Sequence, residues 1–139
     1  MTADIWDPKP PQIDTGPFNR LVGARVDAWG PGIARVVFEV EEKHLNTLGI
    51  AHGGSSMTVL DFAMGMAAAY SPGTEHRRRC VTLSLNTQFL NALRPGPATV
   101  IGRQIGGGGR TLFMEAELMD LDGQVCSRAQ GVFRVVKPE

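Results

Sequence analysis

Apolar and polar side chains alternate along two neighbouring segments near the start of the chain. Residues 21–29 read LVGARVDAW and residues 33–40 read IARVVFEV, with the turn sequence GPG at 30–32 between them. Alternation over about four to eight residues is typical of a half-buried strand, and two such runs joined by glycine and proline are typical of a hairpin. The pattern therefore predicts that residues 21–40 form two antiparallel strands.

The next part of the chain changes from polar to almost entirely apolar. Residues 41–54 read EEKHLNTLGIAHGG, which predicts a loop, whereas residues 55–70 are rich in Met and Ala and contain no proline. The second segment predicts a helix, with Ser55 or Ser56 as its N-cap. Because this helix is apolar on nearly every side, it must be buried on every side. One curved sheet cannot cover it completely, so we expect a second subunit to cover the rest.

Four further runs follow the helix and have the length and composition of strands. Short connections, NALRPGP, GGGG and DG, join them. Because a parallel crossover needs about a dozen residues or more, each strand is expected beside the next one in antiparallel orientation. Two strands, one long helix and four strands predict an α+β fold, in which a curved antiparallel sheet wraps around the central helix. The four runs are CVTLSLNTQFL (80–90), ATVIGRQI (98–105), RTLFMEAELMDL (110–121) and VCSRAQGVFRVV (125–136).

Length and charge limit the classes of protein that this chain can be. Its 139 residues are enough for one domain with one core, which we place at residues 18–139. Residues 1–17 hold four prolines and predict an irregular arm over the domain or over a partner subunit. Fourteen basic residues balance fourteen acidic ones, which argues against a nucleic-acid partner. No stretch approaches the ~20 apolar residues of a spanning helix, so no membrane partner is expected.

The two cysteines and the first residues indicate a cytoplasmic location. Cys80 and Cys126 are too few and too far apart for a disulfide framework, so we expect buried, reduced thiols. The N-terminal sequence has acids and prolines where a signal peptide needs a basic start and an apolar run. His44 and His76 stand in polar loops and are expected to be solvated. With histidines so scattered, no metal site is expected.

A single charged side chain, Asp61, interrupts the apolar helical segment. Its apolar neighbours on both sides predict that it is partly buried. Burying an unpaired carboxylate is costly, and ionisable groups in such surroundings concentrate at functional sites. A hydroxyl group such as that of Thr58 or Thr82 is the alternative, purely structural partner. We therefore interpret Asp61 as a candidate catalytic residue.

The His-Gly-Gly sequence at 52–54 precedes this helix and suggests a second functional group. A helix N-terminus exposes backbone N–H groups without intrahelical partners and carries a partial positive charge. The N–H of Gly53 or Gly54 is therefore a candidate donor to an oxyanion formed from a carbonyl group. Asp61 lies eight residues beyond Gly53, about 12 Å along a helix, so the two cannot reach one carbonyl within one subunit. Two antiparallel helices related by a two-fold axis would bring Gly53 of one to Asp61 of the other, twice per dimer.

Several polar residues near these two positions have open interpretations. His52 either orients the loop or contacts substrate, and Asn46 either points its amide at the site or forms an Asx-turn. Arg110 and the basic residues 77–79 and 94 form either a solvated face or a rim that binds phosphate. The GGGG run at 106–109 is interpreted as a hairpin connection rather than a phosphate-binding nest.

Asn46, the His-Gly-Gly at 52–54 and Asp61, in a β-β-α-β-β-β-β order over about residues 20–136, resemble the PaaI-like hotdog-fold acyl-CoA thioesterases. The resemblance implies that Asp61 is the catalytic carboxylate, as nucleophile or as general base, and that the Gly53 N–H polarises the thioester carbonyl. It implies that His52 and Asn46 position the substrate or the attacking water. Thr82 falls where relatives carry a hydroxyl group near the carboxylate.

The resemblance also implies a reaction and an assembly. Hydrolysis of an acyl-CoA thioester to a free acid and CoA needs no metal or redox cofactor. Coenzyme A enters as part of the substrate. The family pairs its helices in a homodimer, often doubled to a homotetramer, with each site across the dimer interface. Gly54, Met57 and Arg110 are expected to contact substrate, and the expected acyl pocket is lined by Met57, Leu60, Met64 and Phe89.

Two other functions remain compatible with these residues. A hotdog hydratase or dehydratase would also act on acyl thioesters, with His52 and Asp61 as its histidine and acid. A non-catalytic module would bind acyl-CoA without releasing a thiol. The His-Gly-Gly sequence, in which the backbone is the obvious functional group, favours hydrolysis over hydration.

Overall fold

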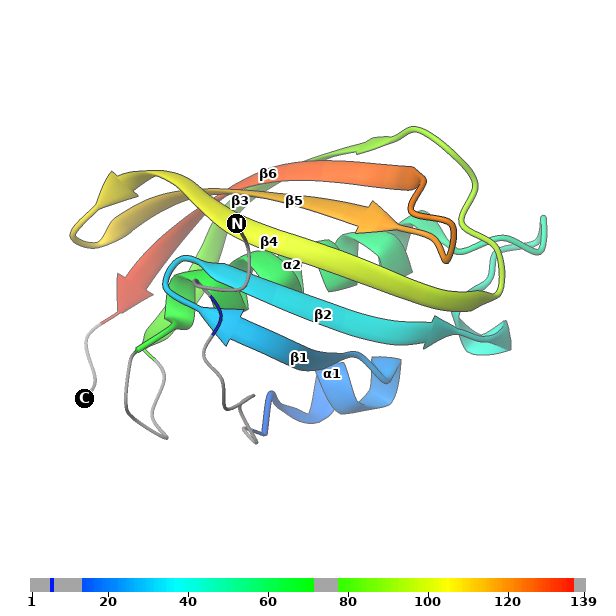
Figure 1. The fold of residues 1–139 in the computed structure, drawn as a ribbon, viewed down its shortest axis with the longest axis horizontal. Coiled ribbons are helices and arrows are strands. Elements are labelled where there is room, and N and C mark those ends of the chain that lie inside the picture. Colours follow the sequence, from blue (N-terminus) through cyan, green and yellow to red (C-terminus); the bar gives the residue numbers. More distant parts are fainter. Residues whose placement is uncertain (1–5, 7–13, 72–77, 137–139) are drawn as a thin grey trace.

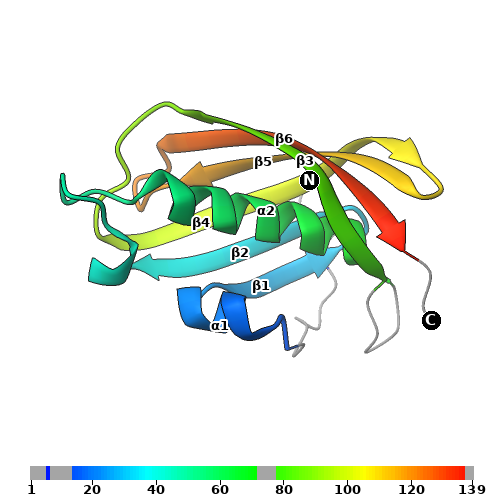
Figure 2. The same ribbon diagram turned by 180° about the vertical axis from the view of Figure 1, so that it is seen from behind.

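A six-stranded antiparallel sheet curls around one long helix in this computed structural model, which describes Trp6 and residues 14–71 and 78–136. Figures 1 and 2 show the helix, α2, lying along one face of the sheet, with the short helix α1 beside β1. The architecture confirms the predicted α+β hotdog fold. The elements in chain order are α1 (Pro17–Val22), β1 (Arg25–Gly30), β2 (Ile33–Val40), the 3-10 helix η1 (Glu42–His44), α2 (Gly53–Ala69), β3 (Arg79–Phe89), β4 (Gly96–Gly108), β5 (Thr111–Met119) and β6 (Val125–Val136).

The core lies between α2 and the inner face of the sheet. Ten of the seventeen residues of α2 are buried, among them Val59, Leu60 and Met64, which are fully enclosed. The helix approaches β4 so closely that a Cβ on Gly102 would lie 2.5 Å from the carbonyl carbon of Ala63, which explains the glycine there. Burial of these side chains is the main stabilising contribution, at roughly 25 cal/mol per Å² of apolar surface.

The order of strands in the sheet, β1-β2-β4-β5-β6-β3, differs from the expected one at a single connection. β3 was predicted to lie beside β4 because NALRPGP is short, but β3 pairs with β6 instead. The segment at 90–95 instead carries the chain from one edge of the sheet to the strand beside β2. Leu93 O accepts a hydrogen bond from Ala51 N (2.8 Å), so this connection is fixed to the loop before α2.

The predicted first hairpin is confirmed from Arg25 onward, with β1 and β2 joined at Pro31–Gly32. Its expected start at Leu21 is wrong, because Pro17–Val22 form the helix α1, with proline at the helix start, a position that it favours. Gly23 ends α1 in the left-handed conformation, at φ 84°. The first 13 residues of the expected arm lie outside the described residues, apart from Trp6, whose ring lies 5.6 Å from the Arg35 guanidinium carbon.

The glycine run at 106–109 is part of a hairpin, as predicted. Gly106–Gly108 end β4, and the turn at Gly109–Arg110 leads into β5. Gly107 has φ 85°, and a Cβ there would collide with the carbonyl oxygen of Thr111. The glycine is therefore required by the close approach of the two strands, which gives it a structural role without any ligand.

Candidate active site

Asp61 is half-buried on α2 and has one side-chain partner on β3. Thr82 Oγ1 donates a hydrogen bond of 2.5 Å to Asp61 Oδ1. The other hydroxyl considered, that of Thr58, donates to the carbonyl oxygen of Gly54 instead (2.8 Å). A hydroxyl that donates to one carboxylate oxygen fixes the orientation of the carboxylate and leaves the second oxygen for other chemistry.

A pocket of about 270 Å³ opens beside Asp61. Polar and apolar side chains line it in about equal measure. The residues lining it are Thr15, Asn19, Asp61, Phe62, Gly65, Met66, Ala69, Arg78, Arg79, Cys80, Thr82 and Phe133. Two of these polar residues, Thr15 and Asn19, come from the N-terminal side of the domain, where the alternation pattern gave no sign of a site.

The start of α2 presents a free backbone donor. His52, not Ser55 or Ser56, is the N-cap, and its Nδ1 accepts a hydrogen bond from Gly54 N (2.8 Å). Gly54 is therefore engaged within the loop. The Gly53 N–H, in contrast, has no acceptor anywhere in the part of the chain that the structure describes. An unpaired N–H at the positive end of a helix is suited to bind an anionic oxygen.

His44 holds the loop that carries this donor, and the expectation that His44 is solvated is wrong. Its side chain is buried, and both ring nitrogens have hydrogen-bond partners. Its Nδ1 accepts from Glu41 N (2.9 Å), and its Nε2 donates to the carbonyl oxygen of Val22 (2.7 Å). The His44 carbonyl accepts from His52 N (2.7 Å). In the sequence, His44 is only one polar residue within a polar segment, so nothing there indicated this role. His76 lies outside the described residues.

Asn46 forms the Asx-turn that was one of its two interpretations. Its Oδ1 accepts from Leu48 N (2.9 Å) and from Ile50 N (3.4 Å). Asn46 and Gly53 nevertheless line one pocket of about 350 Å³, which the ring of Phe89 borders. A Cβ on Gly53 would lie 3.3 Å from Phe89 Cζ, so the glycine keeps the backbone accessible beside this ring.

The two proposed catalytic groups lie in different pockets within one chain. The pocket at Asp61 and the pocket at Gly53 share no lining residue. Both residues belong to α2, where a rise of about 1.5 Å per residue over eight residues separates them by about 12 Å. Within a single subunit, Asp61 and the Gly53 N–H therefore cannot reach the same carbonyl group.

One stripe of α2 is left uncovered by the sheet. Figure 2 shows the helix in front of the sheet, and the less buried positions follow the helical repeat along this side. β3 adjoins the stripe as an edge strand, with Val81 and Leu83 about half exposed. An apolar edge strand beside an open helix face is a surface that another chain can pair with. The open positions of α2 are Gly54, Met57, Thr58, Asp61 and Gly65.

The other predicted contact residues are spread over the molecule. Leu60 and Met64 are fully buried in the core, so their expected place in an acyl pocket is wrong. Met57 is half-buried on the open stripe, and Phe89 lines the Gly53 pocket. Arg110 is exposed in the turn between β4 and β5, at the opposite end of the domain from the start of α2 (Figures 1 and 2).

One of the basic residues after the helix, Arg78, has a structural role that the sequence did not reveal, whereas Arg77 lies outside the described residues. Arg78 donates from its guanidinium to the carbonyl oxygen of Ala68 (2.6 Å), and its backbone N–H donates to Ala69 O (2.9 Å). Arginine at this position satisfies the unpaired carbonyls at the negative end of α2. Within residues 14–71 and 78–136, no three acidic, histidine or cysteine side chains gather as a metal site would require.

The two cysteines differ in their surroundings. Cys80 is half-buried on the wall of the Asp61 pocket, and its thiol donates to Gly65 O (3.4 Å). Cys126 is buried behind the Gly53 pocket, where its carbonyl accepts from Leu90 N and Asn91 N. Burial, together with the nearby Asp120 carboxylate, raises the pKa of the Cys126 thiol.

Comparisons with known proteins agree with this fold. The family model of the thioesterase superfamily matches residues 48–127. A Pseudomonas aeruginosa protein named "Putative esterase PA0474" is 34% identical over 101 residues, 72% of this chain and 73% of its own. None of the described helices is long and apolar enough to cross a membrane.

Two solved structures have closely similar folds. The conserved protein PA5202 of Pseudomonas aeruginosa is 29% identical, with a TM-score of 0.79 over 89% of this chain and 95% of that one. A mutant of the phenylacetic acid degradation protein PaaI of Thermus thermophilus is 25% identical, with a TM-score of 0.77 over 87% and 100% of the two chains. The chain belongs to the thioesterase superfamily, as a PaaI-like hotdog protein, and its general class of reaction is thioester hydrolysis.

Proposed function

We propose that this protein hydrolyses an acyl-CoA thioester in sites that two subunits share. The observation that carries the proposal is that two candidate groups on one helix, Asp61 and the Gly53 N–H, line two separate pockets. Asp61 with Thr82 lies in one pocket, and the free Gly53 N–H lies in another. A thioesterase needs both an attacking group and an oxyanion donor at the same carbonyl.

The chemistry follows from these two groups. In the general-base route, Asp61 removes a proton from water while the water oxygen attacks the thioester carbonyl carbon. The resulting oxyanion accepts a hydrogen bond from the Gly53 N–H, strengthened by the helix dipole. The intermediate then collapses, the C–S bond breaks, and the proton passes to the departing CoA sulfur. In the nucleophilic route, Asp61 itself attacks, CoA leaves, and water hydrolyses the mixed anhydride.

The second subunit is supported by the open stripe of α2 and by β3. If two chains pair along the β3 edges in antiparallel fashion, their helices also run antiparallel, and Gly53 of one approaches Asp61 of the other. Such an isologous contact has two-fold symmetry and generates two equivalent sites. The homodimer is thus the minimal active unit in this proposal, and a homotetramer is its doubled form.

The remaining predicted residues have supporting roles in the proposal. His52 holds the loop through Gly54, and Asn46 shapes the turn before it. Arg110 is exposed and forms no ion pair with the residues that the structure describes, so it is available to bind a CoA phosphate. Coenzyme A enters only as part of the substrate.

The test of the proposal is thiol release. The wild-type protein is incubated with a panel of alkyl- and aryl-CoA thioesters, and free CoA is measured with a thiol reagent. Asp61→Asn is expected to lower kcat by about 10²- to 10⁴-fold, because it removes a group that acts on the proton or the carbonyl carbon. Circular dichroism and size-exclusion chromatography should show an unchanged fold and assembly.

Three results would contradict the proposal. Asp61→Asn protein that hydrolyses acyl-CoA at the wild-type rate would remove Asp61 from the mechanism. Crotonyl-CoA that loses its enoyl absorbance without releasing a thiol would indicate a hydratase, and binding of acyl-CoA without either change would indicate a non-catalytic module.

A further inference from the structure

Gly65 is a glycine in the interior of α2, and no contact with the described residues of its own chain requires glycine there. Its φ is not positive, so the backbone does not require glycine. A Cβ at this position would lie 3.5 Å from Phe133 Cε2, which is an ordinary van der Waals contact. Glycine inside a helix is less favourable than alanine, because it loses more conformational freedom on folding. The missing side chain therefore costs stability that no contact among the residues described by the structure recovers.

The position of Gly65 indicates what the missing side chain leaves room for. Gly65 follows Asp61 by four residues, so both lie on the same side of α2, and Ala69 continues the row. All three residues line the pocket at Asp61. The glycine thus widens this pocket directly next to the carboxylate.

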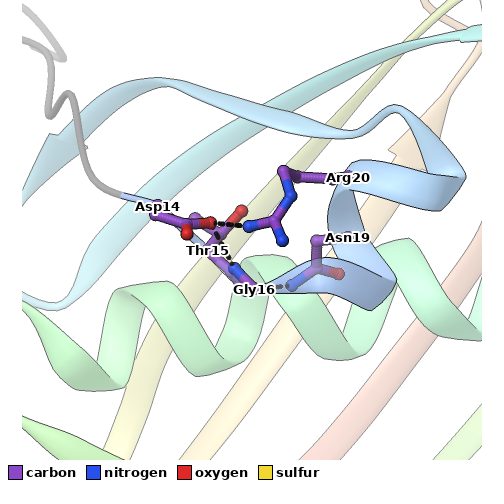
Figure 3. A network of polar contacts seen from close by, with 5 residues as sticks. All are labelled: Asp14, Thr15, Gly16, Asn19 and Arg20. Carbon is purple, nitrogen blue, oxygen red and sulfur yellow. Dashed lines mark hydrogen bonds and ion pairs between the residues drawn. The ribbon is translucent and has the colours of Figure 1, made fainter.

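The segment before α1 and α1 itself supply the opposite wall of this pocket. Figure 3 shows how the segment is held: Asp14 Oδ1 accepts from Gly16 N (2.9 Å) and forms an ion pair with Arg20, and Asn19 Nδ2 donates to Thr15 O (3.0 Å). Thr15 and Asn19 line the pocket. Since Asn19 is fixed through its Nδ2, its Oδ1 acceptor stays available.

The pocket is sized for part of a substrate. Its volume of about 270 Å³ is below the roughly 300–1,000 Å³ of pockets that hold a whole drug-sized ligand, so it cannot enclose an acyl-CoA. Apolar side chains, Phe62, Met66 and Phe133, line it together with polar ones. The apolar part of this lining suits an acyl group better than the amide-bearing pantetheine arm or the phosphates of CoA.

We propose that Gly65 sets the largest acyl group that the enzyme accepts, with Asn19 and Thr15 closing the far side of the same pocket. The inference rests on the proposed function, because it takes Asp61 as the group next to the thioester. It makes a specific statement about substrates. Acyl groups that extend beyond the carbonyl along α2 depend on the empty space at position 65, whereas the shortest groups do not.

The experiment compares Gly65→Ala and Gly65→Val with the wild type over straight-chain acyl-CoAs of increasing length. One methyl or methylene group in an apolar pocket changes kcat/KM by about 10- to 200-fold. For the longest accepted substrate, we expect Gly65→Ala to lower kcat/KM about 10-fold and Gly65→Val to lower it further. For acetyl-CoA, both variants should stay within about two-fold of the wild type.

Matched variants separate this role from a structural one. Gly108→Ala makes the same chemical change at an exposed position where a Cβ meets nothing within 4 Å, and it should leave the length profile unchanged. Asn19→Ala shortens the opposite wall and should move the optimum towards longer acyl groups. Gly65→Ala should also raise Tm, since alanine is the better helix former.

Length dependence is also measured without turnover. Asp61→Asn protein, alone and combined with Gly65→Ala, is titrated with the same acyl-CoAs, and Kd is recorded for each length. Weaker binding of only the longer acyl groups in the double variant supports the proposal even if the protein releases no thiol. The proposal on Gly65 would be overturned if affinity or kcat/KM fell equally at all acyl lengths, or if neither changed at any length. Neither result would bear on the proposed hydrolysis itself.

Discussion

The pocket at Asp61 presents a side chain, whereas the pocket at Gly53 presents the backbone. Asp61 reaches its position from the middle of a buried helix and is oriented by one hydroxyl, that of Thr82. The Gly53 N–H owes its position to a network of loop contacts, in which His52 caps α2 and the buried His44 binds the loop. The Asp61 carboxylate is thus positioned by few groups that contact it directly. The Gly53 N–H is positioned by many groups that do not contact it.

The difference decides how Asp61 and the Gly53 N–H respond to substitution. A single exchange removes the carboxylate, but no exchange of a neighbouring side chain removes a backbone N–H. Only proline at position 53 deletes that donor. Proline is favoured at the first residue of a helix, and the residue before it, His52, has ψ 137°, which a following proline accepts.

The largest effect is expected when Asp61 and the Gly53 N–H are inactivated in different chains. Asp61→Asn and Gly53→Pro should each be nearly inactive as homodimers. When both are produced together with different tags, mixed dimers combine an intact Asp61 and an intact Gly53 at one of their two sites. Random pairing should restore about a quarter of the wild-type thiol release.

The mixed dimers isolated by both tags should have about half of the wild-type rate per dimer. A site contained within one subunit would give no recovery, because every chain would carry a defect. Chromatography of each single variant checks that Gly53→Pro still assembles.

A smaller effect is expected from the hydroxyl that orients Asp61. Thr82→Val keeps the shape of the side chain and removes its hydrogen bond to the carboxylate. Hydrogen bonds to charged groups contribute roughly 1.5–3 kcal/mol, so kcat should fall about 10- to 150-fold. Thr58→Val is the matched control, because that hydroxyl bonds to Gly54 O. Equal losses in both variants would mean that Thr82 acts through general stability.

The smallest effect concerns the thiol behind the Gly53 pocket. Because burial raises the pKa of Cys126, the folded protein keeps this proton at a pH where the unfolded chain has lost it. The contribution to stability is therefore present below the ordinary thiol pKa of about 8.5 and is lost as the pH rises above it. Thermal unfolding between pH 7 and 10 should show a fall in Tm that Cys126→Ala reduces. Cys80→Ala, which removes the other thiol, should show the same fall in Tm as the wild type. If Cys126→Ala leaves the fall in Tm unchanged, the fall does not come from Cys126.

Local patterns were sufficient to predict most of the fold. The apolar segment at 55–70 became α2, and each of the four later runs became a strand at nearly its predicted bounds. The pairing of β3 with β6 was not predictable, because it joins segments about 45 residues apart and depends on the curvature of the whole sheet. α1 escaped prediction because six residues are too few for a clear helical period.

The features of the candidate site that the sequence indicated are those that depend on one unusual residue. An isolated Asp61 in an apolar helix and glycines before it are visible in the chain, and the separation of the two follows from helix rise alone. The cap at His52, the burial of His44 and the wall at Asn19 were not visible. The burial of His44 and the wall at Asn19 arise where segments distant in sequence meet, for example at the bond from His44 to Val22. The cap at His52 is local, since its partner is the N–H of Gly54.

The bond between His44 and Val22 means that the N-terminal segment is no removable extension of the domain. A chain shortened beyond Val22 would leave the buried imidazole N–H without an acceptor, at a cost of about 1–3 kcal/mol. Because the carbonyl of the same histidine supports His52, the damage would spread to the start of α2. Protein engineers who wish to shorten the chain or attach a fusion partner should therefore keep Val22 and the helix α1 that ends with it.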